Sequence, residues 1–114
     1  MDLKKLLQFI EIEDGRLKKY YGDYADQEKR ILTRTVKLTE ELGELCEEVL
    51  AHSSLQRKQK LENHDKENLS EEFADVIITA LLLAKAMNID IEKALEKKAD
   101  KVNKRYEDEN FKKS

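Results

Sequence analysis

Residues 69–87 read LSEEFADVIITALLLAKAM, and the predicted architecture follows from this segment. Apolar side chains cover nearly the whole circumference of the helix that it predicts, so this helix must be buried on most of its sides. The chain also has no proline, three glycines and 41% charged residues, which is a composition that favours helices. We therefore predict an all-α protein, an antiparallel bundle of about four helices, in one domain that spans residues 1–114.

Four helices are predicted, over about residues 2–13, 28–52, 68–87 and 91–106. The Asp-Gly pair at 14–15 either ends the first helix or weakens it. Asn68 and Glu71 are expected to form a capping box, and Asp90 is expected to cap the fourth helix. The polar residues 53–67 predict a loop or a frayed helical extension. The third helix has more apolar surface than three neighbours in one small chain cover, which favours a homo-oligomer.

One polar strip interrupts the apolar third helix, and it contains Glu72, Asp75 and Thr79. The helix dipole explains acidic residues in the first turn, such as Glu71 and Glu72. It explains Asp75 less well, because Asp75 lies about two turns into the helix among apolar neighbours. An ionised carboxylate there requires a lysine, an arginine or a metal ion as its partner.

The second predicted helix carries five glutamates within residues 40–49, EELGELCEEV. On a helical wheel Glu41, Glu44 and Glu48 form a ridge at the rim of the apolar arc, which consists of Leu38, Leu42, Leu45 and Val49. A solvated acidic face is one interpretation of this ridge, and Glu47 and Glu40 are expected to belong to such a face even if the ridge is functional. The alternative interpretation is a functional site.

Two acidic pairs at i, i+3 therefore lie on facing helices, Glu41 with Glu44 and Glu72 with Asp75. Four converging carboxylates raise one another's pKa values unless a cation lies among them. Ligands that are all oxygen indicate a hard ion, Mg²⁺ or Mn²⁺. The remaining metal-ligating residue types are not assigned to the site: His52 and His64 are predicted to be surface residues, and Cys46 a small core residue.

A basic row follows on the fourth helix, where Lys98, Lys101 and Arg105 lie on one flank. The predicted buried stripe beside them consists of Ile91, Leu95, Val102 and Tyr106. The row has two interpretations: ion-pair partners for neighbouring acids, or a clamp for phosphate oxygens.

Composition and charge exclude several classes of protein. The net charge of −3 disfavours nucleic acid as the main partner. The lone cysteine allows no internal disulfide and suits a reducing compartment. The N-terminal residues lack the pattern of a signal peptide, and the longest apolar run, residues 76–84, is too short to span a membrane. We expect a cytoplasmic protein without a membrane partner.

Over about residues 36–106 the sequence resembles the MazG-type nucleotide pyrophosphohydrolases, of the all-α NTP pyrophosphatase superfamily. That family has an E-E-x-x-E segment, an E-E-x-x-D segment, and then lysines and an arginine. The matching residues are Glu40, Glu41 and Glu44 in KLTEELGEL; Glu71, Glu72 and Asp75 in LSEEFADVI; and Lys98, Lys101 and Arg105 in KKADKVNKR. The connection between the two acidic segments is long, and Ala74 stands where the family often has glycine.

The resemblance implies hydrolysis of a nucleoside triphosphate between its α- and β-phosphates, to a monophosphate and pyrophosphate, in nucleotide-pool house-cleaning. It implies that Mg²⁺ is held by Glu41, Glu44, Glu72 and Asp75, with Mn²⁺ as a substitute. Glu40 or Glu71 would be an outer-shell ligand or the catalytic base. The basic row, Lys98, Lys101 and Arg105, would bind the substrate phosphates. A homodimer or a homotetramer is also implied.

Two alternatives stay open at this point. Dimeric dUTPases and phosphoribosyl-ATP pyrophosphohydrolases share this acid-rich helical architecture and would differ in substrate. A helical interaction module without catalysis would use its acids for solvation or for ion pairs with the basic row.

An i, i+3 Glu-x-x-His pair is absent from the sequence, which argues against a di-iron bundle for metal storage. The tyrosines at 20, 21 and 24 either stack on a base or pack into the edge of the bundle.

Overall fold

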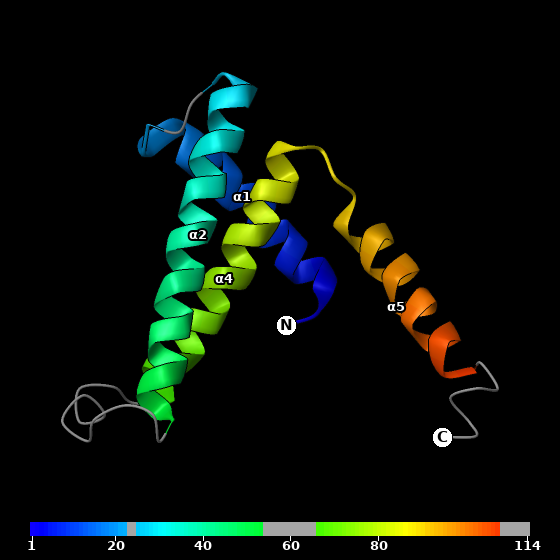
Figure 1. Cartoon of the computed structure of the whole chain (residues 1–114). Helices are drawn as coiled ribbons and strands as arrows, with labels where there is room; N and C mark the ends of the chain where they lie inside the picture. Colours follow the sequence, from blue (N-terminus) through cyan, green and yellow to red (C-terminus); the bar gives the residue numbers. More distant parts are fainter. Residues whose placement is uncertain (23–24, 54–65, 108–114) are drawn as a thin grey trace.

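The computed structural model describes residues 1–22, 25–53 and 66–107, and helices are the only regular secondary structure in these ranges. The helices are α1 (Leu3–Tyr20), α2 (Gln27–His52), α4 (Lys66–Ala86) and α5 (Ile91–Glu107) (Figure 1). This arrangement confirms the prediction of an all-α helical bundle. None of the helices in the described ranges is long and apolar enough to cross a membrane.

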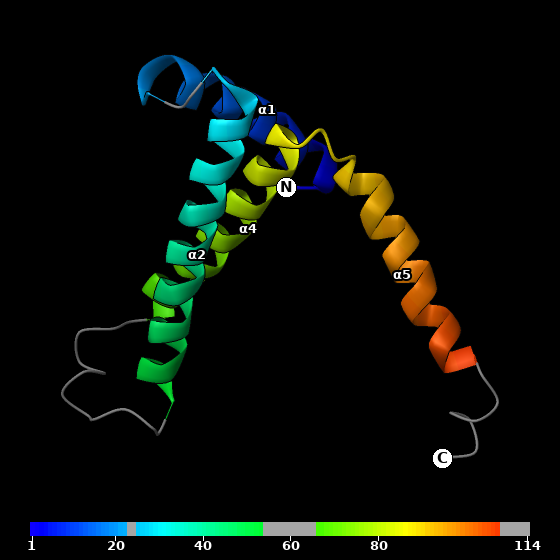
Figure 2. The ribbon, with the colours of Figure 1, turned by 45° about the horizontal axis from the view of Figure 1, so that its top comes forward.

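The α2 and α4 helices run antiparallel and side by side, and they form the most extensive contact between helices (Figures 1 and 2). The α1 helix packs across α4 near the C-terminal end of α4. Its Ile10 is buried against Leu81 and Leu82 of α4, and this small core is surrounded by partly buried side chains of Leu6, Leu7, Phe9, Leu17, Ile78 and Ile91. The core therefore joins α1 to the C-terminal half of α4.

The α1 helix is longer than predicted, because Asp14 and Gly15 neither end it nor interrupt it. Asp14 is almost fully buried and accepts from Lys18 at 2.9 Å and from Arg34 at 2.7 Å. Burial opposes ionisation of Asp14, but the hydrogen bonds and charges of Lys18 and Arg34 outweigh it, and the pKa of Asp14 falls below its usual range. These contacts hold the second half of α1 on α2.

Arg34 also fixes the position of α2 relative to α4. Its Nη1 atom donates to the carbonyl oxygen of Leu82 at 2.8 Å, so one buried guanidinium connects α1, α2 and α4. Near the same end, Gln27 Nε2 donates to the carbonyl oxygen of Ala86 at 2.9 Å. The relative orientation of α2 and α4 is therefore set by specific polar contacts in addition to apolar packing.

The ends of α4 agree only in part with the prediction. The helix begins at Lys66, so Asn68 already lies inside it and the predicted capping box is wrong. At the other end Asn88 adopts a positive φ of 57°, and the N–H of Ile89 donates to the carbonyl oxygen of Ala84 at 3.0 Å. Asp90 then caps α5 as predicted, since its Oδ1 accepts from the N–H of Lys93 at 3.1 Å.

The α5 helix diverges from the other three helices after this turn (Figures 1 and 2). None of its residues is fully buried. Leu95 is 50% exposed and Tyr106 is 66% exposed, which contradicts burial of these two members of the predicted stripe, whereas Ile91 and Val102 are partly buried. Ile91 packs on the core of α1 and α4, but these helices do not cover Leu95 or Tyr106.

Candidate metal centre

The buried face of α2 is mixed, because charged side chains lie there together with part of the leucine arc that the sequence predicted to face the core. Arg34 and Glu41 are buried, with Glu41 only 8% exposed. Within the predicted arc, Leu38 and Leu45 are partly buried, whereas Leu42 and Val49 are 49% and 43% exposed. The helix pair is therefore rotated so that carboxylates lie at its interface, where apolar side chains would normally be found.

The opposing face of α4 contributes the polar strip that the sequence singled out. Thr79 is buried and donates from its hydroxyl to the carbonyl oxygen of Asp75, and Glu72 is partly buried. One carboxylate oxygen each from Glu41, Glu72 and Asp75 lies within 4.8 Å of the other two. Asp75 itself is exposed, although the sequence placed it among apolar neighbours. The buried carboxylate is that of Glu41, and Glu72 is partly buried. The three carboxylates form a cluster that is buried on one side and open on the other; this candidate site is called the metal centre below.

Negative charge dominates the electrostatics of the metal centre, although Lys37 forms an ion pair with Glu41 at its border. Burial raises the pKa of Glu72, and the surrounding carboxylates raise it further, namely Glu44, Asp75, Glu41 and Glu48. The Oε2 atoms of Glu41 and Glu72 are buried and have no hydrogen-bond partner among the described residues. Buried carboxylate oxygens without donors are costly, and a cation coordinated by them removes that cost.

The donor set fits a hard divalent cation. All three groups offer carboxylate oxygens, and the described residues place no histidine or thiol among them. Ligands at adjacent corners of an octahedral Mg²⁺ site with bonds of about 2.1 Å lie roughly 3 Å apart. The three oxygens, which lie within 4.8 Å of one another, would move closer together on binding such an ion. Water would complete the coordination shell on the open side, where Asp75 is exposed.

Lys37 borders the metal centre, and sequence reasoning did not select it. Its Nζ lies 3.2 Å from Oε1 of Glu41 and 3.6 Å from Oε2 of Glu40, and these carboxylates raise the pKa of Lys37, Glu41 more than Glu40. The i, i+4 spacing between Lys37 and Glu41 is the signal that could have identified this contact. Because the ammonium group engages Oε1, Oε2 of Glu41 remains for a metal.

The other predicted ligands and catalytic residues lie around the cluster and not within it. Glu44 is exposed one turn from Glu41, and it contributes to the negative field at Glu72. Glu40 and Glu71 are exposed, Glu40 beside Lys37. The whole basic row, Lys98, Lys101 and Arg105, is exposed on α5, and the fold of one chain does not bring it to the acidic cluster.

Three further predictions concern residues away from the centre. Cys46 is exposed, so its assignment to the core is wrong. His52 is exposed as predicted, whereas His64 lies outside the described residues. Tyr20 and Tyr21 are 66% and 78% exposed, which contradicts packing into the bundle for these two. Tyr24 lies outside the described residues.

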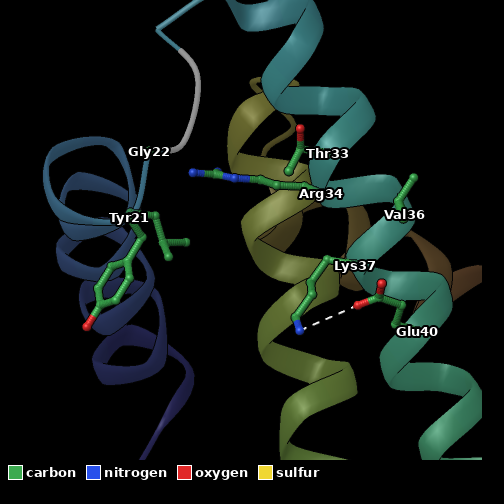
Figure 3. Close-up of a pocket in the computed structure, with 8 residues that line it drawn as sticks. Tyr21, Gly22, Thr33, Arg34, Val36, Lys37 and Glu40 are labelled. Atoms are coloured by element: carbon green, nitrogen blue, oxygen red, sulfur yellow. Dashed lines mark ion pairs between the residues drawn. The ribbon is translucent and has the colours of Figure 1, made fainter.

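A hollow of about 510 Å³ lies between the end of α1 and α2. Its lining consists of Leu17, Tyr21, Gly22, Thr33, Arg34, Val36, Lys37 and Glu40. Figure 3 shows Arg34 and Lys37 extending from α2 into the space between the helices. Lys37 and Glu40 belong both to this hollow and to the border of the metal centre, so the two features are adjacent.

Comparisons with known proteins agree with this arrangement of residues. The family model of the MazG nucleotide pyrophosphohydrolase domain matches residues 29–109, a range that includes both acidic segments and the basic row. An uncharacterized protein of Bacillus subtilis (strain 168), YpjD, is 32% identical over 104 residues, which are 91% of this chain and 89% of that protein. No solved structure matches the chain. The chain belongs to the MazG nucleotide pyrophosphohydrolase family.

Proposed function

We propose that this protein is a Mg²⁺-dependent nucleoside triphosphate pyrophosphohydrolase that cleaves the linkage between the α- and β-phosphates. The observation that carries the proposal is the pair of buried carboxylate oxygens without donors, Oε2 of Glu41 and Oε2 of Glu72, within a three-carboxylate cluster. Family membership supplies the reaction class, hydrolysis of a nucleotide pyrophosphate linkage. Water adds across the phosphoanhydride, and the products are a nucleoside monophosphate and pyrophosphate.

In this proposal Glu41, Glu72 and Asp75 hold the ion, and Glu44 reaches it from the next turn of α2. When bound, Mg²⁺ offsets the charge of the phosphates and lowers the pKa of a coordinated water. Mn²⁺ has the same preference for oxygen and would substitute. The chain itself orients the water through Glu40 or Glu71, which are solvent-accessible acids next to the ligand residues. Lys37 connects Glu40 to the metal centre, because its Nζ lies 3.6 Å from Oε2 of Glu40 and 3.2 Å from Oε1 of Glu41.

The hollow between α1 and α2 would receive the nucleoside part of the substrate. Its volume of about 510 Å³ falls in the range of small-molecule sites. Leu17 and Val36 give it apolar walls, while Tyr21, which is 78% exposed, offers a flat group that stacks on a base. Lys37 stands between this hollow and the metal centre, where a phosphate would pass. The basic row would bind the remaining phosphate oxygens.

We further propose that the protein acts as a homodimer or a homotetramer in the cytoplasm, where it would remove aberrant nucleotides. The half-exposed apolar residues on α2 and α4 support self-association, among them Leu42, Phe73 and Ile77. The single, exposed Cys46 is compatible with a reducing compartment.

A panel of substrates tests the proposed function. Canonical and modified ribo- and deoxyribonucleoside triphosphates, dUDP and phosphoribosyl-ATP are incubated with and without MgCl₂, and release of pyrophosphate and phosphate is measured. We expect pyrophosphate from at least one nucleoside triphosphate, only with the metal, and none from the Asp75→Asn variant. Asp100→Asn is the matched control, because it makes the same chemical change at an exposed position on α5. Phosphate release from dUDP would indicate a dUTPase-like enzyme instead. An inactive protein whose stability is insensitive to Mg²⁺ would indicate an interaction module.

A further inference from the structure

The hollow between α1 and α2 offers acceptors of hydrogen bonds more readily than donors. The hydroxyl of Thr33, which lines the hollow, donates to the carbonyl oxygen of Lys29 at 2.9 Å. While this bond is kept, Oγ1 of Thr33 can only accept from a ligand. An ionised carboxylate such as that of Glu40, which also lines the hollow, accepts and does not donate. A ligand that donates is therefore matched to these two groups.

The cationic donors around the hollow are already engaged by the protein. Nη1 of Arg34 donates to the carbonyl oxygen of Leu82 at 2.8 Å and lies 2.7 Å from Oδ1 of Asp14. Nζ of Lys37 is held by the two glutamates at the border of the metal centre, at 3.2 Å and 3.6 Å. Tyr21 contributes its ring, and Figure 3 shows its hydroxyl directed away from α2. A ligand that takes a hydrogen bond from either cation therefore competes with contacts of the native protein.

The end of α1 strengthens this preference for a donating ligand. Leu17 of its last turn lines the hollow together with Tyr21 and Gly22, which directly follow the helix. The C-terminal end of a helix carries a partial negative charge and carbonyl groups without intrahelical donors. Lys18 of the same turn is paired with Asp14 at 2.9 Å. The hollow therefore favours the N–H groups of a ligand over its carbonyl oxygens.

Thr33 is also placed along α2 so that it can meet the base of a nucleotide bound at the metal centre. Thr33, Lys37 and Glu41 follow one another at intervals of four residues along one face of α2. The helix rises by about 12 Å between Thr33 and Glu41. A nucleotide whose phosphates reach the metal centre past Lys37 extends its base toward Thr33, because the ribose separates the two.

We propose that Thr33 determines base specificity by accepting an N–H from an exocyclic amino group of the substrate. This inference rests on the proposed function, because it assigns the base to the hollow beside the metal centre. The 4-amino group of cytosine and the 6-amino group of adenine are such donors, whereas uracil and hypoxanthine carry a carbonyl oxygen at the same ring position. The substrates are therefore nucleoside triphosphates with an amino base, and deaminated nucleotides such as dUTP are rejected.

The discrimination has a direct physical cause. The carbonyl oxygen of uracil would face Oγ1 of Thr33, and these are two acceptors without a proton between them. The hydroxyl could donate to that oxygen only by giving up its bond to the carbonyl of Lys29. One neutral hydrogen bond of this kind corresponds to a factor of about three to ten in affinity. A site that binds an N–H in this way rejects an analogue that lacks it.

Pairs of triphosphates that differ only in this group test the proposal. Release of pyrophosphate is measured with MgCl₂ for CTP against UTP and for ATP against ITP, and kcat/KM is compared within each pair. We expect the amino member to be preferred by about three- to tenfold in the pair that is hydrolysed faster. Thr33→Val keeps the shape of the side chain without its oxygen, so its ratio should fall toward equality. Thr33→Ser retains the hydroxyl and should retain the preference.

Thr35→Val is the matched control on the same helix. The hydroxyl of Thr35 also donates to a carbonyl oxygen four residues earlier, that of Ile31 at 2.7 Å, but Thr35 does not line the hollow. The control should keep the wild-type ratio. A loss equal to that of Thr33→Val would assign the effect to the helix and overturn the proposal. A wild type without a preference for the amino member, or an unchanged ratio in Thr33→Val, would overturn it as well.

A binding experiment separates this inference from the proposed function. The α,β-imido analogues of the same four nucleotides, which resist cleavage at that linkage, are titrated into the protein with MgCl₂, and dissociation constants are measured by calorimetry. We expect tighter binding of the amino members and loss of this difference in Thr33→Val. Such a result in a protein that releases no pyrophosphate from any triphosphate would retain the base site and refute the proposed function alone. Equal binding within each pair, or no binding, overturns the role assigned to Thr33.

Discussion

Replacement of Asp75 by asparagine should have opposite effects in the absence and in the presence of Mg²⁺. Without metal, the substitution removes one of three carboxylates whose oxygens lie within 4.8 Å of one another. Two unit charges at that distance repel by about 0.9 kcal/mol in water and by roughly 3.5 kcal/mol at an effective dielectric constant of 20. Because Asp75 is exposed, the value in water applies, and two such pairs give about 1–2 kcal/mol.

The metal-free Asp75→Asn variant should therefore be more stable than the wild type by about 1–2 kcal/mol, since aspartate and asparagine have similar helix propensities. With Mg²⁺ at ten times its dissociation constant, the wild type gains about 1.4 kcal/mol and the variant, which lacks one ligand, gains much less. The advantage of the variant then shrinks or reverses. Urea unfolding in EDTA and in MgCl₂, at one fixed protomer concentration, measures both effects.

The Asp100→Asn control should show neither effect, because Asp100 lies on α5 outside the cluster. Two results would refute the reasoning. The first is a variant that is less stable than the wild type in EDTA, since the carboxylate would then have a stabilising partner within the protein. The second is an equal gain in stability from Mg²⁺ for both proteins, since the ion would then bind elsewhere.

Other substitutions test the fold and the electrostatics. Arg34→Ala should cost about 3–5 kcal/mol in urea unfolding, because it leaves Asp14 buried with Lys18 as its remaining cation; a cost below about 1 kcal/mol would contradict the role of this contact. Gly15→Ala should stabilise the protein by roughly 0.4–1 kcal/mol, since the position is helical and a Cβ there meets nothing within 4 Å; a loss of stability would show that α1 ends there. The pKa of Asp14 is lowered in the fold, so its stabilising contribution is complete at pH values above the pKa of the unfolded chain, and acid unfolding should remove it as the pH falls through the native value. The pKa of Glu72 is raised, so metal-free protein should lose stability as the pH rises through that value, and Glu72→Gln should abolish this loss; an unchanged pH profile in the variant would assign the effect to other groups.

The helices and the identity of the acidic residues were predictable because each depends on local information. Helical periodicity and the lack of proline placed α2 and α5 to within one residue or so at each end. Asp90 was identified as an N-cap from its position before the apolar residues of α5. The i, i+3 spacing of Glu72 and Asp75 placed both on one face, and the structure brings Glu41 to them.

The rotation of α2 was not predictable from a helical wheel. The wheel identifies the apolar side of a helix and assumes that this side faces the core. Here a buried ion pair between Arg34 and Asp14, together with the hydrogen bond to Leu82, turns the face of Arg34 and Glu41 inward and leaves Leu42 half-exposed. Such long-range polar contacts have no signature in the local sequence. For the same reason, the spacing of residues on α5 could not show that the helix diverges from its own chain.

The account depends on a divalent cation held between α2 and α4. Crystals grown or soaked with Mn²⁺ provide the measurement, because anomalous scattering locates this ion independently of any model of the protein. We predict one anomalous peak coordinated by oxygens of Glu41, Glu72 and Asp75, with these oxygens drawn from within 4.8 Å to about 3 Å of one another. Well-ordered crystals without a peak at this position, with the three carboxylates solvated or paired with lysines, would contradict the account.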